Sequence, residues 1–98
     1  MDTEAENIAV VNNEADQRFQ AEVGGNLAYL QYHKRQGQIV YTHTEVPKEM
    51  EGKGIGGKLA KAALEQAKAE HLRVVAQCPF VASYIQRHKE YQPLLASD

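Results

Sequence analysis

The chain has 98 residues, of which 11 are basic and 13 acidic, and its formal net charge of -2 provides no positive field to attract nucleic acid. No apolar run reaches the roughly twenty residues that span a bilayer, and the acidic start of the chain lacks the apolar stretch of a signal peptide. The only cysteine, Cys78, excludes an intrachain disulfide and is typical of a reducing compartment. We therefore expect residues 1–98 to form one cytoplasmic domain that binds neither nucleic acid nor a membrane, with a disordered N-terminus at 1–7.

The first half of the chain predicts an antiparallel meander. Polar and apolar residues alternate with period two over 17–23, as in a half-buried strand, and Gly24 and Gly25 before Asn26 indicate a hairpin. The segment 39–46 is the clearest strand because β-branched residues and Tyr dominate it. In chain order we expect a short apolar segment at 8–11, a turn at 12–16, strands at 17–23 and 27–33, a turn at 34–38, and a strand at 39–46.

The second half changes to helical composition. Residues 55–71 are mostly strong helix formers with apolar side chains along one face, and 72–76 is a short apolar strand. A strand that returns after one helix forms a βαβ unit, so this strand should pair parallel to 39–46. Residues 80–88 predict a second helix, with Pro79 near its first turn. The tail should fold back on the sheet through Tyr91, Pro93, Leu94 and Leu95.

Four glycines, Gly52, Gly54, Gly56 and Gly57, lie within six residues between the last strand of the meander and the long helix. Glycine accepts positive φ and lets a ligand approach closely, and a helix N-terminus offers free N–H groups and the positive end of the dipole. A strand, a glycine loop and a helix together are typical of a phosphate or pyrophosphate site. A Walker A loop is excluded because Leu59 stands where that loop has a hydroxyl, and the glycine spacing excludes a dinucleotide fingerprint.

A third type of glycine loop fits, and it carries a family resemblance. Glu51–Gly56 matches the acyl-CoA loop Gln/Arg-x-x-Gly-x-Gly/Ala of the GNAT N-acetyltransferases, except that Glu51 replaces Gln or Arg. Two further motifs occur in order with it: His-Thr-x-Val-Pro at 43–47 and Cys-x-Phe-Val-Ala-Ser-Tyr at 78–84. Over roughly residues 27–95 the chain therefore resembles the small, YjdJ-type N-acetyltransferase domain proteins of that superfamily.

The resemblance implies an α/β (α+β) fold of minimal GNAT type, with a mixed, mostly antiparallel sheet, one long CoA-binding helix and a short second helix. It also implies that acetyl-CoA is the co-substrate, without a metal, and that an acetyl group passes by direct attack to an amine on a small molecule or a protein. Because the chain is short, the parts that wall the acceptor pocket in larger relatives are missing. The alternative is therefore a non-catalytic acyl-CoA-binding or sensing module.

The resemblance assigns the CoA pyrophosphate to the glycine loop, mainly through backbone N–H groups, with positive charge added by Lys53 and Lys58. The alternative for each lysine is a solvated surface residue. Backbone groups around Val46 would hold the pantetheine arm. The residues expected to bind CoA are Val46, Glu51, Gly52, Lys53, Gly54, Ile55, Gly56, Gly57 and Lys58.

His43 and Cys78 are the two candidate catalytic residues. His43 precedes the loop on the same strand, and imidazole is suited to take a proton from the attacking amine. Strand alternation directs it to the face opposite Thr42 and Thr44, and the alternative is a structural strand histidine. Cys78 precedes a helix, whose N-terminus stabilises a thiolate, so a covalent acetyl-cysteine is one interpretation. The other, which we favour, is a small buried residue that lines the CoA groove.

Tyr84 lies on the helix that supplies the general acid in larger GNAT enzymes. Aligning the usual terminal aromatic with Tyr91 places Gln86, and not Tyr84, at the expected position of that acid. Tyr84 is then about 200° around the helix from that position, so we expect it to pack in the interior. The sequence assigns no general acid.

Overall fold

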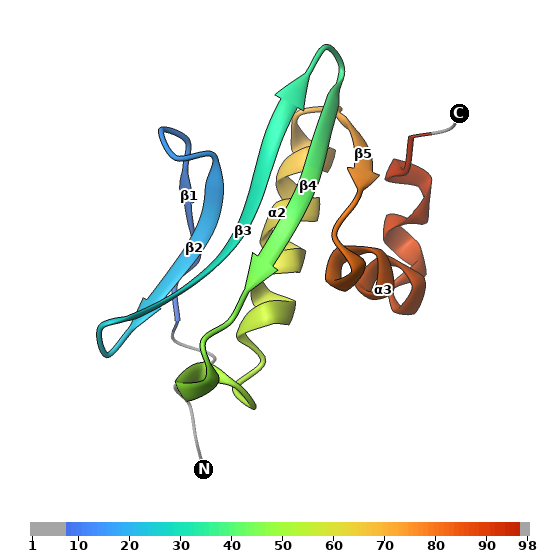
Figure 1. Cartoon of the computed structure of the whole chain (residues 1–98). Helices are drawn as coiled ribbons and strands as arrows, with labels where there is room; N and C mark the ends of the chain where they lie inside the picture. Colours follow the sequence, from blue (N-terminus) through green and yellow to red (C-terminus); the bar gives the residue numbers. More distant parts are fainter. Residues whose placement is uncertain (1–7, 97–98) are drawn as a thin grey trace.

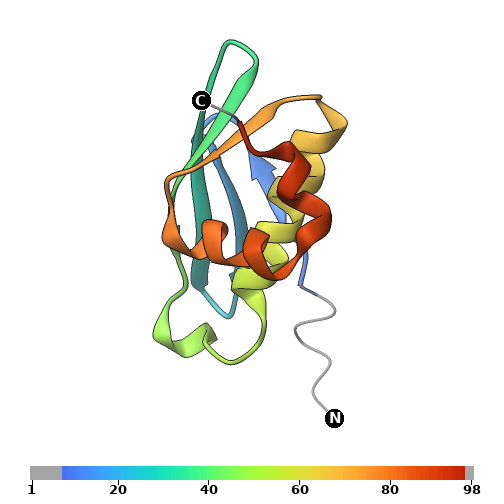
Figure 2. The same ribbon diagram turned by 90° about the vertical axis from the view of Figure 1, so that its right-hand side faces the viewer.

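The computed structural model describes residues 8–96, so the expected disordered segment at 1–7 lies outside the described residues. Five strands form one sheet in the order β1-β2-β3-β4-β5. Figures 1 and 2 show α2 lying across one face of this sheet, with α3 beside the first half of α2. The elements are β1 (Val11–Asn13), β2 (Arg18–Val23), β3 (Asn26–Arg35), β4 (Gln38–Glu45), the 3-10 helix η1 (Lys48–Met50), α2 (Ile55–Ala69), β5 (Arg73–Ala76), α3 (Pro79–Arg87) and the 3-10 helix η2 (Lys89–Leu94).

The predicted topology is confirmed. Strands β1 to β4 pair antiparallel in sequence order, and β5 returns after α2 to pair parallel with the first half of β4. The tail also folds back as expected, because the Ala96 amide donates to the Val74 carbonyl oxygen at 2.8 Å and Leu95 forms a parallel bridge with Val74. Across residues 8–96, no helix combines the length and the hydropathy needed to cross a membrane.

The first turn lies later in the chain than the predicted range of 12–16. Asn12 and Asn13 belong to β1, where they pair with Phe19 and Arg18, and the turn follows at residues 14–17. Asparagine is unfavourable in strands on intrinsic grounds, but here a partner strand and a hydrogen bond from the Tyr32 hydroxyl to Asn12 Oδ1, at 2.7 Å, hold it extended. The long helix also ends at Ala69, before His71, whose φ of 59° is incompatible with a continuing helix.

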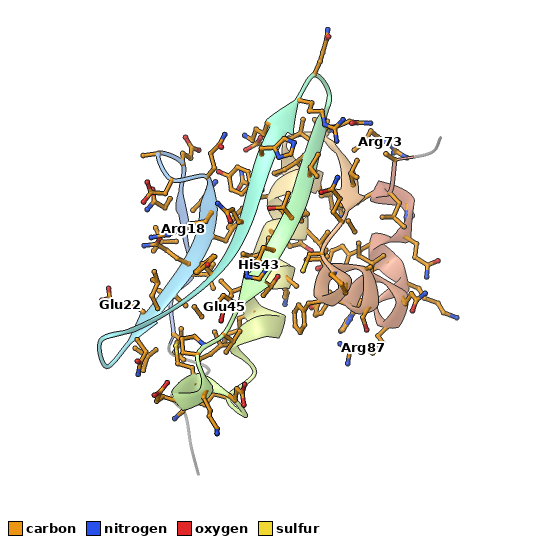
Figure 3. All side chains as sticks on the ribbon, in the orientation of Figure 1. Arg18, Glu22, His43, Glu45, Arg73 and Arg87 are labelled. Carbon is orange, nitrogen blue, oxygen red and sulfur yellow. The ribbon has the colours of Figure 1, made fainter. Side chains whose placement is uncertain are left out.

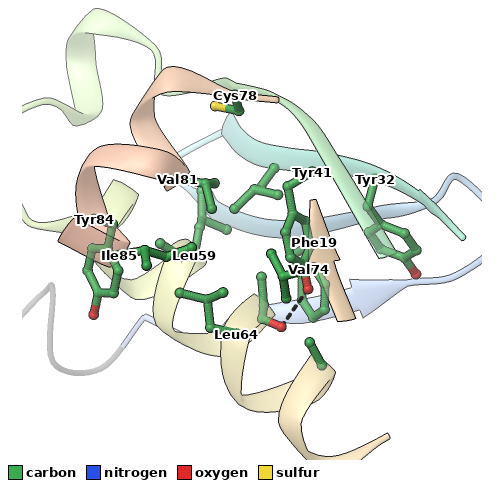
Figure 4. Close-up of a cluster of buried hydrophobic side chains, with 14 of the residues drawn as sticks. Phe19, Tyr32, Tyr41, Leu59, Leu64, Val74, Cys78, Val81, Tyr84 and Ile85 are labelled. Carbon is green, nitrogen blue, oxygen red and sulfur yellow. Dashed lines mark hydrogen bonds between the residues drawn. The ribbon is translucent and has the colours of Figure 1, made fainter. Parts of the chain in front are cut away.

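The hydrophobic core lies between the sheet and the two helices (Figure 4). Leu59 and Leu64 of α2 are fully buried and face Val74 and Tyr41 of the sheet. The Tyr41 hydroxyl donates to the Ala63 carbonyl oxygen at 2.6 Å, which ties the middle of α2 to the centre of β4. Burial of this ring raises the pKa of Tyr41 above its usual range. The position of α2, and hence of the loop before it, is set by this packing.

A β-bulge in β4 determines where its side chains point. Tyr32 pairs with Tyr41, whereas the preceding residue Gln31 pairs with His43, so Thr42 is the extra residue. The bulge also marks the end of the parallel ladder, since β5 pairs with β4 only as far as Tyr41. The next two amides of the β5 chain, those of residues 77 and 78, both donate to the Tyr41 carbonyl oxygen, at 3.1 and 3.0 Å. Beyond this point β4 and the β5 chain separate.

Candidate functional site

The glycine loop connects η1 to α2 at the end of the sheet where β4 and β5 separate. Met50 of η1 is buried and fixes the start of the loop in the core. Gly52 and Gly54 have φ of 83° and 73°, in the left-handed region that favours glycine. A Cβ at either position would meet nothing within 4 Å, so the backbone conformation, and not a lack of space, calls for glycine there. The loop is therefore open to solvent on the side where these side chains would stand.

The first turn of α2 offers unpaired backbone donors. Gly54 is the N-cap, no side chain caps the helix, and the first intrahelical bond runs from the Lys58 amide to the Gly54 carbonyl oxygen at 3.1 Å. The three preceding amides, at residues 55–57, have no acceptor within the helix because of their position in it. Anions bind readily at such a helix start. A shallow hollow of about 260 Å³ adjoins this turn, and it is lined by Val46, Met50, Glu51, Gly52, Gly54, Ile55, Gly56, Gly57 and Phe80.

Phe80 is a residue of this site that the sequence analysis missed. A Cβ on Gly56 would lie only 2.8 Å from Phe80 Cζ, so the tip of the ring rests on the glycine backbone. Phe80 occurs in the third motif of the sequence, and this motif is the only feature of the sequence that could have pointed to a role for Phe80 in the site. Its contact with a residue 24 positions earlier depends on how α3 packs against α2, which no local pattern shows.

Thr44 and Cys78 meet on the helix-covered side of the sheet. Thr44 is opposite Leu30, whose side chain is fully buried, and its Oγ1 lies 3.2 Å from the Cys78 sulfur. Cys78 is the N-cap residue of α3 and is 3% exposed. The contact lies just beyond Tyr41, where the strands separate. A small buried thiol thus closes the inner end of the opening between β4 and the β5 chain.

His43 lies on the opposite, uncovered face of the sheet (Figure 3). Its Nε2 is 3.0 Å from Glu45 Oε1, and its ring centroid is 6.1 Å from that of Tyr29 on β3. The guanidinium of Arg18 lies over the same Tyr29 ring, 5.3 Å from its centroid. Both His43 and Glu45 are 54% exposed. An imidazole in this position can exchange protons with a molecule that approaches the open face.

The structure does not bring the two candidate catalytic residues together. His43 and Cys78 are on opposite faces because the bulge at Thr42 turns His43 outward and Thr44 inward. His43 is thus opposite Thr44, as the alternation predicted, while the Thr42 hydroxyl donates to the Gln31 carbonyl oxygen at 3.3 Å within the bulge. A cysteine–histidine pair for nucleophilic catalysis is therefore absent from the described part of the chain.

The remaining predicted site residues surround the loop. Glu51 is exposed, and Lys53 and Lys58 are half-buried.

Tyr84 packs as expected: it is 8% exposed and stacks on the His88 ring at a centroid distance of 3.9 Å. Burial raises the pKa of Tyr84. This packing leaves the tyrosine protonated at neutral pH and directed into a cluster of rings.

A larger hollow lies elsewhere, along the edge of β5 that faces away from β4. It has a volume of about 760 Å³ and runs between β5, α3 and the tail. Val74, Ala76, Ile85 and Leu95 are among its lining residues, together with polar side chains such as Gln86. It is separate from the glycine loop, because the two hollows share no lining residue. Its volume exceeds that of the hollow at the glycine loop, whereas the helix start and the glycine backbone favour the loop as the site of an anion.

Comparisons with known proteins agree with the geometry. The family model of the GCN5-related N-acetyltransferases matches residues 18–94. The NMR solution structure of a GCN5-like candidate N-acetyltransferase from Staphylococcus aureus superposes with a TM-score of 0.72 at 27% sequence identity, covering 94% of this chain and 91% of that one. No curated protein matches the chain in sequence. The structural match and the mixed five-stranded sheet with two helices confirm the predicted fold. Because the family model covers most of the sequence, the chain belongs to the GCN5-related N-acetyltransferase (GNAT) family.

Proposed function

We propose that the protein transfers an acetyl group from acetyl-CoA to an amine by direct attack in a ternary complex. The observation that carries this proposal is the open N-terminus of α2, capped by left-handed Gly54 and placed beside the separation of β4 and β5. Membership of the GNAT family supports the use of an acyl-CoA. No metal takes part in the proposed reaction.

The first turn of α2 and the glycine loop fit a pyrophosphate. Three backbone amides there lack intrahelical acceptors, and the helix dipole favours negative charge at the same place. The open space at Gly52 and Gly54 leaves room for the anion. Lys53 and Lys58 add positive charge, whereas Glu51 carries the same sign as the ligand. The Glu51 amide already donates to the Lys48 carbonyl oxygen at 3.2 Å, so we assign to Glu51 a place in the lining of the hollow and the binding energy to the amides of α2 and the lysines.

The separated part of β4 fits the pantetheine arm. Between Tyr41 and Val46 the strand still pairs with β3, but β5 no longer covers its other edge. A strand edge of this kind presents backbone N–H and C=O groups, which match the amides of the arm. The reactive end of the co-substrate would then lie near the contact between Thr44 and Cys78, at the inner end of the opening.

His43 is proposed to take the proton of the attacking amine. The amine nitrogen attacks the thioester carbonyl, a C–N bond forms, the C–S bond breaks, and the CoA thiolate leaves. If the imidazole donates Nε2–H to Glu45, the lone pair remains on Nδ1 and can accept the amine proton. The exposed position of His43 on the uncovered face leaves room for an acceptor that approaches from solvent. We assign no general acid, so the thiolate would be protonated by solvent.

Cys78 is proposed to line the acyl end of the groove without forming a covalent intermediate. Among residues 8–96 it has no histidine beside it to act as base, and the polar group next to its sulfur is the Thr44 hydroxyl. Burial of the thiol also restricts access to it. Direct transfer needs neither an activated thiol nor a second acyl transfer, so it agrees best with this arrangement.

The experiment is calorimetric titration with CoA and acetyl-CoA, followed by an assay of thiol release in the presence of spermidine and a lysine-containing peptide. Binding together with amine-dependent thiol release supports the proposal. Binding of CoA without transfer to either amine would favour the alternative of a non-catalytic acyl-CoA-binding or sensing module. Absence of binding at about millimolar CoA would reject both functions, since that is the weak end of useful affinity.

A further inference from the structure

Phe80 is exposed although it is large and apolar. It is the second residue of α3, and 36% of its surface is accessible; Val11 on β1, at 56%, is the other large hydrophobic residue exposed among residues 8–96. The ring does not lie loose on the surface, because its tip rests on the backbone of Gly56. The tip of the ring is thus fixed against α2, while part of the ring remains accessible to solvent.

The ring lies along the path between the two ends of the proposed site. It lines the hollow at the glycine loop together with Val46, the residue that follows β4. It also follows Cys78 by two residues, and Cys78 contacts Thr44 at the inner end of the opening. A ligand anchored on the first turn of α2 and reaching toward this contact must pass the exposed part of the ring.

We propose that Phe80 is a specificity-determining residue that forms an apolar wall for the pantetheine arm, so that the site distinguishes CoA from nucleotides that end at the pyrophosphate. This role rests on the proposed function. The physical reason is that the arm carries methylene and methyl groups, whose transfer from water onto an apolar ring is favourable. The pyrophosphate, by contrast, is bound by amides and charge and gains nothing from the ring.

Gly56 has a matching role in this proposal. Any side chain there would push the ring, since the Cβ would approach Phe80 Cζ to 2.8 Å. The family motif accepts Gly or Ala at this position, but in this chain an Ala would require the ring of Phe80 to move. Positions 56 and 80 should therefore act as a coupled pair.

The experiment compares two ligands on four proteins by calorimetry. The ligands are CoA and 3′-phospho-ADP, which is CoA without the pantetheine arm, and the proteins are the wild type, Phe80→Ala, Phe80→Leu and the control Val11→Ala. We expect Phe80→Ala to weaken CoA binding about tenfold, the loss that corresponds to part of one apolar side chain, and to leave the affinity for 3′-phospho-ADP unchanged. Phe80→Leu should recover most of the loss, and Val11→Ala should change neither affinity.

Equal weakening of both ligands by Phe80→Ala would overturn the proposal, because the ring would then act on the loop and not on the arm. Unchanged binding of CoA would overturn it as well. A wild type that binds neither ligand would remove the proposed function itself, which separates that failure from a failure at Phe80. Gly56→Ala provides a second test that does not depend on how well Phe80→Ala folds: it should weaken CoA binding in the wild type and much less in the Phe80→Leu background.

Discussion

The Thr44 hydroxyl oxygen lies 3.2 Å from the Cys78 sulfur, across the opening that forms where β5 stops pairing with β4. This contact joins the last part of β4 to the N-cap residue of α3, and it places the thiol on the face opposite His43. The two candidate catalytic residues are thereby separated by the sheet. Their separation favours direct transfer over a covalent acetyl-cysteine.

Replacement of Cys78 tests that choice. Cys78→Ser keeps the size of the side chain and a partner for Thr44, so we expect a variant that binds CoA and retains most of its acetyl transfer. Cys78→Ala should behave in the same way apart from a modest loss of stability. The measurement is steady-state thiol release, combined with intact mass spectrometry of the wild type after exposure to acetyl-CoA. Loss of turnover in both variants, together with an acetylated wild-type cysteine, would establish the covalent mechanism instead.

Replacement of His43 tests the proposed base. His43→Gln should lower kcat about a hundredfold, the low end of what a positioned base contributes, and leave the dissociation constant of CoA unchanged. His33→Gln is the matched control, because His33 is an exposed histidine on the neighbouring strand β3. His33→Gln should change neither kcat nor the dissociation constant of CoA. An unchanged kcat in His43→Gln would make His43 a structural histidine.

Tyr41 provides a test of how the loop is supported. Tyr41→Phe removes the hydroxyl that donates to the Ala63 carbonyl oxygen in the middle of α2, and we expect a loss of about 1 kcal/mol in the free energy of unfolding. Urea denaturation measures the loss, and Tyr29→Phe, on the uncovered face, is the control. Equal stabilities of Tyr41→Phe and the wild type would mean that the hydrogen bond does not hold α2 in place.

The ion pair between Lys34 and Glu70 predicts a dependence of stability on pH. The Lys34 amine, 2.9 Å from the carboxylate, and then the Gln66 amide lower the pKa of Glu70, while Glu70 raises the pKa of Lys34. Because the pKa of Glu70 is lowered, the pair stabilises the fold above the unfolded pKa of Glu70, and this stabilisation is lost as the pH falls through the folded pKa. Because the pKa of Lys34 is raised, the pair stabilises the fold below the unfolded pKa of Lys34, and this stabilisation is lost as the pH rises through the folded pKa.

The pair therefore contributes between these two limits. Both side chains are about a third exposed, so screening by solvent keeps the contribution near 0.5 kcal/mol. Glu70→Gln should lower the free energy of unfolding at neutral pH and have no such effect at strongly acidic pH, and Glu22→Gln on β2 is the control. A difference that persists in acid would show that packing, and not the ion pair, is responsible.

The sequence predicted the glycine loop well because its signals are local. Three features of the loop depend on the residues at that place in the chain. They are the positive φ at Gly52 and Gly54, the start of the helix at Ile55, and the strand before the loop. The parallel return of β5 followed from the βαβ rule, which depends only on the order of the elements.

Features that depend on distant partners were not predictable in this way. The bulge at Thr42 arises from how β3 pairs with β4, so strand alternation alone could not show which of Thr42 and Thr44 faces the core. The contact of Phe80 with Gly56 and the extension of β1 to Asn13 likewise come from packing between segments far apart in the chain. In each case tertiary contacts outweigh local preference.

The proposed function requires the first turn of α2 to hold the pyrophosphate of an acyl-CoA. The most direct measurement is a titration of the isotope-labelled protein with CoA, followed through its backbone amide resonances. We expect the largest shifts at Gly54, Ile55, Gly56 and Gly57, with smaller ones from Thr44 to Val46. Shifts confined to the hollow along β5, around Val74, Ile85 and Leu95, or no shifts at about millimolar CoA, would contradict it.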